Sequence, residues 1–156
     1  MQDWRLLALP LIAEFEGCAR KGKDGLIYPY LDKIAKPNVW TRGYGRTYGI
    51  TETSKGITMG EALEELGVGI EMYALEVINL SPYLVLRPLC MAAIVSWTWN
   101  CGVGAYRRSR LKRAINSERW EDGAEFIKKP NTAGGIVVRG LTIRRTLESK
   151  LFREGI

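Results

Sequence analysis

Apolar residues recur at three- and four-residue spacing near the start of the chain, which is the pattern of one helical face. The series consists of Trp4, Leu7, Ala8, Leu11, Ile12 and Phe15. Gly17 is expected to end this helix, because glycine readily adopts the left-handed conformation that closes helices. Glu16 is therefore predicted at the C-terminal edge of the helix, at a junction with the next segment.

The pattern changes over residues 26–50, where β-forming residues are interrupted by residues that favour turns. The β-formers are Tyr28, Tyr30, Val39, Trp40, Thr41, Tyr44 and Tyr48, and the interruptions are Pro29, Pro37, Gly43, Gly45 and Gly49. This segment predicts a small, twisted antiparallel sheet.

Helical periodicity returns after residue 58. Thr58 and Glu61 have the spacing of a capping box, a pair that begins many helices. Apolar positions then continue at helical period through Ala62, Leu63, Leu66, Ile70, Tyr73 and Val77. They predict a long helix over about residues 59–79 that links the sheet to the rest of the chain.

The second half of the chain is predicted to be helical. Pro88 and Gly102 frame a segment that is apolar on all sides, which is typical of a helix at the centre of a lobe. Further helices are expected at about 108–116, 118–129 and 141–153, with a glycine-rich loop from Asn131 to Gly140.

These elements predict an α+β fold in a single domain over residues 1–156. A small antiparallel β lobe is expected at about residues 20–57. The long helix would join it to a larger helical lobe, which comprises about residues 80–156 and the N-terminal helix.

The net charge of +6 is concentrated in the C-terminal third. Residues 101–156 hold 13 Lys and Arg against 6 Asp and Glu, whereas residues 1–100 hold 10 against 11. A positive face favours polyanions such as nucleic acid, anionic lipid or the bacterial envelope, and it is equally compatible with a solvated helix face.

Two features bear on the compartment of the protein. Asp3 precedes the apolar residues of the N-terminus and Pro10 directly follows them, so we expect no signal peptide. The longest apolar stretch, from Pro88 to Trp99, is shorter than the roughly 20 residues that span a bilayer. We interpret it as a buried core helix.

The positions of the cysteines and the absence of histidine exclude several kinds of bond and catalytic site. Cys90 and Cys101 would lie about 16 Å apart on one helix, too far to form a disulfide, and with Cys18 they are expected to be free thiols, as in a reducing cytosol. The chain has no histidine, which excludes histidine-based triads and most catalytic zinc sites. Acid–base chemistry must therefore come from carboxylates, and we expect no metal and no cofactor.

Three residues form a candidate catalytic set. Glu16 leaves an apolar helix, where desolvation would keep it protonated as a general acid. Asp32 lies in the predicted β lobe, where a wetter setting would leave it ionised and able to activate water. Thr41 follows in the same lobe. Two carboxylates that flank a glycosidic bond are the usual apparatus of glycoside hydrolysis.

These segments resemble the phage lysozyme family, glycoside hydrolase family 24. The resemblance lies in Glu16-Gly17, in Tyr30-Leu31-Asp32 and in WTRGYGRT at residues 40–47. It implies that Glu16 is the general acid, that Asp32 positions or activates water, and that Thr41 helps to hold that water. It also implies a lysozyme-like fold.

The resemblance continues through the chain, with two departures. SWTWNCG at 96–102 and GLTIRRTLESKLF at 140–152 are similar to family segments, and by this matching Arg144 or Arg145 would pair with Glu16, unless both lie on a solvated helix face. Arg46 stands where the family usually has histidine. The interval from Glu16 to Asp32 is long, which leaves Asp24 as an alternative to Asp32.

The resemblance implies an endolysin that cleaves the β-1,4 bond between N-acetylmuramic acid and N-acetylglucosamine in peptidoglycan. A monomer is expected, held in the host cytoplasm until a holin-like membrane permeabiliser lets it reach the wall. Three alternatives stay open at this point: a lytic transglycosylase, a basic nucleic-acid-binding protein, and an inactive wall-binding module. The resemblance implies no nucleic-acid partner.

Overall fold

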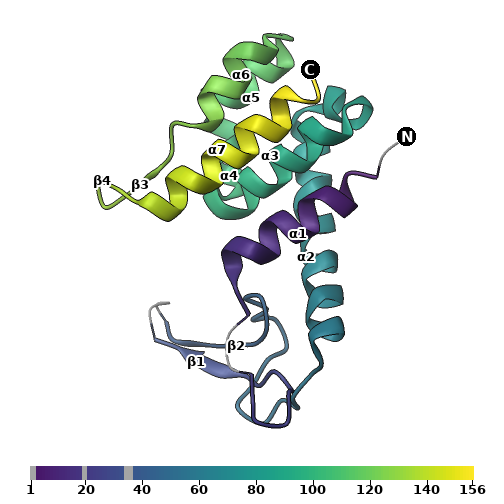
Figure 1. Ribbon diagram of the computed structural model, residues 1–156, viewed down its shortest axis with the longest axis vertical. Coiled ribbons are helices and arrows are strands. Elements are labelled where there is room, and N and C mark those ends of the chain that lie inside the picture. The colour runs from purple at the N-terminus through teal and green to yellow at the C-terminus, as the bar shows by residue number, and fades with distance from the viewer. Residues whose placement is uncertain (1–2, 19–20, 34–36) are drawn as a thin grey trace. The chain divides into compact units, whose positions relative to one another are not determined.

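The computed structural model describes residues 3–18, 21–33 and 37–156. In chain order its elements are α1 (Arg5–Glu16), β1 (Tyr30–Asp32), β2 (Val39–Thr41), α2 (Met59–Leu80), the 3-10 helix η1 (Pro82–Leu86), α3 (Pro88–Cys101), α4 (Val103–Arg108), α5 (Arg110–Asn116), α6 (Trp120–Ile127), β3 (Thr132–Ala133), β4 (Ile136–Val137) and α7 (Arg139–Arg153) (Figure 1). The helices and the small antiparallel sheets confirm the predicted α+β class.

The chain divides into two compact units. The β unit is Ala13–Gly69. The helical unit combines the N-terminal residues up to Ile12 with Ile70–Ile156. The predicted limits of a single domain and its lobes remain a prediction.

The helical unit is built around α3. Every residue of α3 from Cys90 to Thr98 is buried, as its uniformly apolar sequence predicts. It packs against α7, α4 and η1, while α6 packs against α5 and α7 (Figure 1). All three cysteines are free, as expected.

A buried charge cluster joins α7 to α3. Glu148 is fully buried and accepts hydrogen bonds from Arg144 Nε, at 3.1 Å, and from Arg145. It also accepts from the Ser96 hydroxyl of α3 at 2.6 Å. Arg145 in turn donates to Asn100 at the end of α3 and to the Pro130 carbonyl oxygen before the β3–β4 hairpin. Opposite charges and satisfied hydrogen bonds make burial of these groups tolerable.

The β unit is held by short pairings rather than by a large sheet. Strands β1 and β2 are antiparallel, and Ile27 bridges Ile57 through two backbone hydrogen bonds. The capping box at the start of α2 is confirmed, because the Glu61 carboxylate accepts from the Thr58 N–H at 2.8 Å and Thr58 Oγ1 accepts from the Glu61 N–H.

A turn before β1 is organised by Asp24. Its carboxylate accepts hydrogen bonds from the Tyr28 hydroxyl at 2.6 Å and from the Leu26 N–H at 3.1 Å. These donors hold the pKa of Asp24 below its ordinary value of 3.8, and the bond to the carboxylate raises the pKa of Tyr28.

The structure corrects three details of the predicted elements. The helix expected over 108–116 is broken at Ser109, whose hydroxyl caps α5 by accepting from the Lys112 N–H at 2.9 Å. Residues 82–86, for which no helix was predicted, form η1. The loop expected from Asn131 to Gly140 contains the β3–β4 hairpin, which turns at Gly134 and Gly135, both with positive φ.

Replacing Glu148 by alanine is expected to lower the free energy of unfolding by about 3–5 kcal/mol, because two buried guanidinium groups lose a carboxylate that both of them contact. Urea denaturation would measure the loss. The control is Glu154→Ala, at an exposed acid just after α7, with an expected change within about 0.5 kcal/mol. Similar losses in both variants would contradict a special role for the buried cluster.

The turn of Asp24 predicts a pH-dependent contribution to stability. A carboxyl group with a depressed folded-state pKa stabilises the fold above its ordinary value of 3.8 and loses that contribution as pH falls through the folded-state pKa. Tyr28→Phe removes the main donor, so it should destabilise the protein at neutral pH and progressively less below pH 3.8. Urea titrations across this range test the trend. Tyr48→Phe, at an exposed tyrosine outside the turn, should show no such trend.

Candidate active site

Glu16 is the last residue of α1, as predicted. Gly17 follows with φ of +62°, and its N–H donates to the Ala13 carbonyl oxygen at 3.1 Å, which closes the helix. Glu16 is exposed, and the expected desolvation of its carboxyl group remains a prediction. The buried residues of α1 are Ala8 and Ile12, and Glu16 continues their four-residue spacing at the exposed end of the helix.

Asp32 and Thr41 lie on the two paired strands. The register places Asp32 opposite Val39 and Tyr30 opposite Thr41. Side chains alternate along a strand, so Asp32 and Thr41 share one face of the sheet as diagonal neighbours, whose Cβ atoms are typically about 7 Å apart. Asp32 is half-buried and Thr41 is buried, and the Thr41 hydroxyl lies 3.4 Å from the Val39 carbonyl oxygen.

All three predicted residues fall within the β unit, Ala13–Gly69. The register of β1 and β2 brings Asp32 and Thr41 together. Glu16 lies on a different element, at the end of α1. Asp24, the alternative second carboxylate, is exposed and accepts two hydrogen bonds within its own turn. These bonds stabilise the turn.

A partly buried ion pair supports the chain directly after Thr41. Arg42 donates to Glu65 of α2 at 2.5 Å and to the Lys55 carbonyl oxygen at 2.9 Å. Arg46 closes the tight turn by exchanging backbone hydrogen bonds with Arg42, and its guanidinium lies 3.6 Å from the same Glu65 oxygen. The residue at the family's histidine position therefore keeps a structural ion pair, with a permanently charged group.

Glu65 was not singled out from the sequence. It lies between Ala62 and Leu66, both buried positions of α2. A carboxylate beside the buried face of a helix usually has a charged partner. The helical period of α2 places Glu65 beside that face, so the sequence could have indicated that Glu65 is paired. The partner could not be identified, because Arg42 is distant along the chain.

Arg144 and Arg145 are buried, at 2% and 1% exposure, so the alternative of a solvated helix face is wrong. Both donate to Glu148 within the helical unit. Pairing of either arginine with Glu16 remains a prediction.

Cys18, close to Glu16 in sequence, is half-buried and packs on the small core of Ile27, Ile57 and Ala62. Burial raises the pKa of its thiol, which lowers the fraction of reactive thiolate. We interpret Cys18 as a packing residue.

Metal clusters and membrane-spanning helices are both absent from the described part of the chain. Within residues 3–18, 21–33 and 37–156, His, Cys, Asp and Glu side chains form no cluster of three that could hold a metal ion. None of the described helices combines the length and apolar character needed to cross a membrane.

Comparisons with known proteins identify the family. The sequence profile of the phage lysozyme family matches residues 13–148. The chain is 27% identical over 135 residues to the endolysin of Bacillus phage PZA, covering 86% of this chain and 52% of that protein. It is 29% identical over 133 residues to the SAR-endolysin of Enterobacteria phage P21, covering 83% of this chain and 77% of that protein. The chain thus spans about half the length of the Bacillus phage relative.

Solved structures agree in fold. The muramidase domain of SpmX from Asticaccaulis excentricus superposes with a TM-score of 0.77 at 26% identity, covering 94% of each chain. The active form of the P1 phage endolysin Lyz gives a TM-score of 0.75 at 22% identity, covering 99% of this chain and 85% of that chain. Matched over most of its length by the profile and over nearly all of it by the folds, the chain belongs to the phage lysozyme family.

Proposed function

We propose that the chain is an endolysin of the muramidase type, which hydrolyses the β-1,4 bond between N-acetylmuramic acid and N-acetylglucosamine in peptidoglycan. The observation that carries the proposal is the strand register, which gives Asp32 and Thr41 one shared face within the segment that the family profile matches. The printed names of relatives and of a structural neighbour, endolysin and muramidase, point to the same activity.

The mechanism follows from the settings of the three residues. Glu16, exposed at a helix end, donates a proton to the leaving glycosidic oxygen as the bond to the anomeric carbon breaks. Asp32 accepts a proton from a water molecule that attacks the same carbon from the opposite face. Thr41, buried on the rigid ladder, holds that water by a hydrogen bond. Attack on the opposite face inverts the anomeric configuration.

The nearest alternative is a lytic transglycosylase, which uses a single acid and forms an anhydro-sugar. The second carboxylate and the hydroxyl on one sheet face favour attack by water instead. Digestion of isolated peptidoglycan separates the two reactions. New reducing ends are the expected product, whereas anhydro-sugars would establish the transglycosylase and no release would point to an inactive wall-binding module or a nucleic-acid-binding protein.

Further parts of the proposal concern the cell. We propose that the protein is a monomer, accumulates in the host cytoplasm and depends on a holin-like permeabiliser to reach the wall. Its three free cysteines suit a reducing compartment. Peptidoglycan lies outside the cytoplasm, so an enzyme made there requires a route across the membrane.

Glu16→Gln is expected to lower the rate of wall hydrolysis by about 10²–10⁴-fold, because the amide cannot supply the proton. Release of reducing ends measures the rate. The matched control is Glu14→Gln, another exposed acid of α1, which should retain activity. Near wild-type turnover by Glu16→Gln would remove the central assignment.

Asp32→Asn should abolish or severely reduce hydrolysis with little change in melting temperature, whereas Asp24→Asn should be nearly silent in activity. The reason is that Asp32 is held on the strand ladder, while Asp24 is engaged in its turn. The same assay compares both variants. The reverse outcome would transfer the second carboxylate's role to Asp24, and full activity in both variants would favour the transglycosylase.

A further inference from the structure

The β3–β4 hairpin and the residue that follows it carry exposed aliphatic side chains. Ile136, Val137 and Val138 are 73%, 64% and 37% exposed. The hairpin turns at Gly134-Gly135, and the Val138 N–H donates to the Asn131 carbonyl oxygen at 3.0 Å, which closes its base. Figure 1 shows it projecting from the start of α7, beyond the helices of its unit. The result is an exposed apolar tip.

The chain around this tip has a positive charge. Residues 126–147 contain no Asp or Glu. Lys129 precedes the hairpin and Arg139 follows it, and among the described residues neither has an acidic group within 4.0 Å. Lys128 pairs with Glu125 at 2.9 Å, so its charge is partly compensated. Two uncompensated cations therefore flank the apolar tip.

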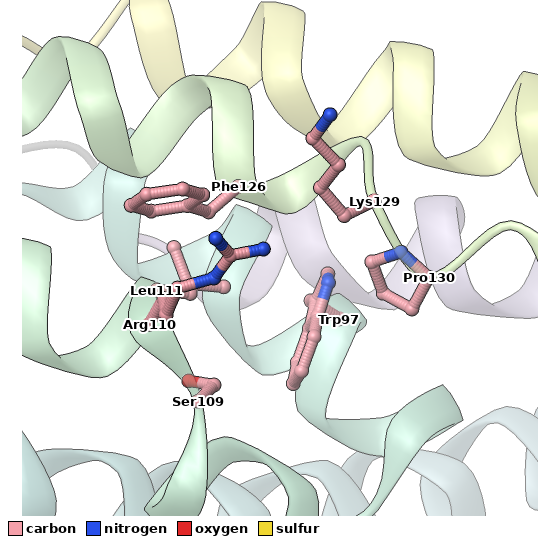
Figure 2. Close-up of a pocket in the computed structure, with 7 residues that line it drawn as sticks. All are labelled: Trp97, Ser109, Arg110, Leu111, Phe126, Lys129 and Pro130. Carbon is pink, nitrogen blue, oxygen red and sulfur yellow. The ribbon is translucent and has the colours of Figure 1, made fainter.

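A cavity of about 310 Å³ beside the hairpin's base extends this basic region (Figure 2). Arg110 and Lys129 both line it, and the Arg110 guanidinium lies 5.0 Å from the centre of the Phe126 ring. Arg110 also has no acidic group within 4.0 Å in the part of the chain that the structure describes. A third cation thus lines the same cavity as Lys129 and Pro130, which precede the hairpin (Figure 2).

A second apolar stripe in the molecule has the opposite electrostatic setting. Val68, Met72 and Leu75 on α2 are 60%, 66% and 63% exposed, which is comparable to the hairpin. Helix α2 carries five acidic residues and no basic one, in the sequence MGEALEELGVGIEMYALEVINL. The α2 stripe and the hairpin therefore have comparable apolar exposure and opposite charge, so substitutions in one serve as a control for substitutions in the other.

We propose that the β3–β4 hairpin is a membrane-docking tip for anionic phospholipid. Ile136 and Val137 enter the interface between headgroups and acyl chains, while Lys129, Arg139 and Arg110 contact the lipid phosphates. A small apolar tip alone binds bilayers weakly, and surface cations supply the second attraction that reversible binding requires. The α2 stripe does not dock, because its acids are repelled by the same surface.

Co-sedimentation of the purified chain with vesicles tests the proposal. Binding is expected to vesicles of equal parts phosphatidylglycerol and phosphatidylcholine, to weaken as salt rises, and to be nearly absent with phosphatidylcholine alone. The double variant Ile136→Ser/Val137→Ser should lose about tenfold or more in vesicle affinity, because both apolar anchors are removed. These positions are exposed, so the variant should fold with an unchanged melting temperature.

The matched control is Met72→Ser/Leu75→Ser, which removes a similar apolar area from the acidic stripe and should bind vesicles like the parent chain. Lys129→Gln/Arg139→Gln should bind weakly and with a smaller salt dependence. Absence of binding by the parent chain, equal binding to both lipid mixtures, or an unaffected hairpin variant would overturn the proposal. Vesicle binding is measured without cell walls, so its failure leaves the proposed hydrolysis untouched.

Discussion

The helical unit depends on one buried carboxylate. Glu148 receives two guanidinium groups from its own helix and a hydroxyl from α3, and through Arg145 the same cluster reaches the chain that enters the β3–β4 hairpin. Such a cluster adds little net stability to a core, because each ion loses its hydration. Its main effect is to fix the position of α7 relative to α3. Apolar contacts would tolerate sliding of α7 along α3, whereas hydrogen bonds between fixed partners allow a single register.

In the β unit an ion pair also fixes the position of one segment against a helix. Two strands of three residues cannot be stable by themselves. The chain that leaves β2 is therefore fixed to α2 by the pair of Arg42 with Glu65, and the small core of Ile27, Ile57 and Ala62 lies alongside. Thr41 directly precedes Arg42, so this ion pair also fixes a residue of the proposed catalytic set.

Much of the fold could be predicted from the sequence, because its signals are local. Helical period, the capping box at Thr58 and the glycine after Glu16 each depend on neighbouring residues. The buried charges could not be predicted, because Arg42 and Glu65, or Ser96 and Glu148, are far apart in sequence. The exposure of Glu16 could not be predicted from spacing either, because helical period shows which residues share a face and not where along the helix that face is covered. For the candidate site, residue types and spacing suggested the set, and the strand register added the shared face of Asp32 and Thr41.

The arginine at position 46 has a consequence for how the protein responds to its surroundings. An imidazole there would gain or lose its charge near neutrality, and with it the attraction to Glu65. A guanidinium keeps its charge at every pH in which the protein is folded, and the chain has no histidine elsewhere. No imidazole therefore changes its charge in this protein near neutral pH. The guanidinium groups of Arg42 and Arg46 after Thr41, and of Arg139 beside the hairpin, should keep their positive charge in an acidified medium as in a neutral one.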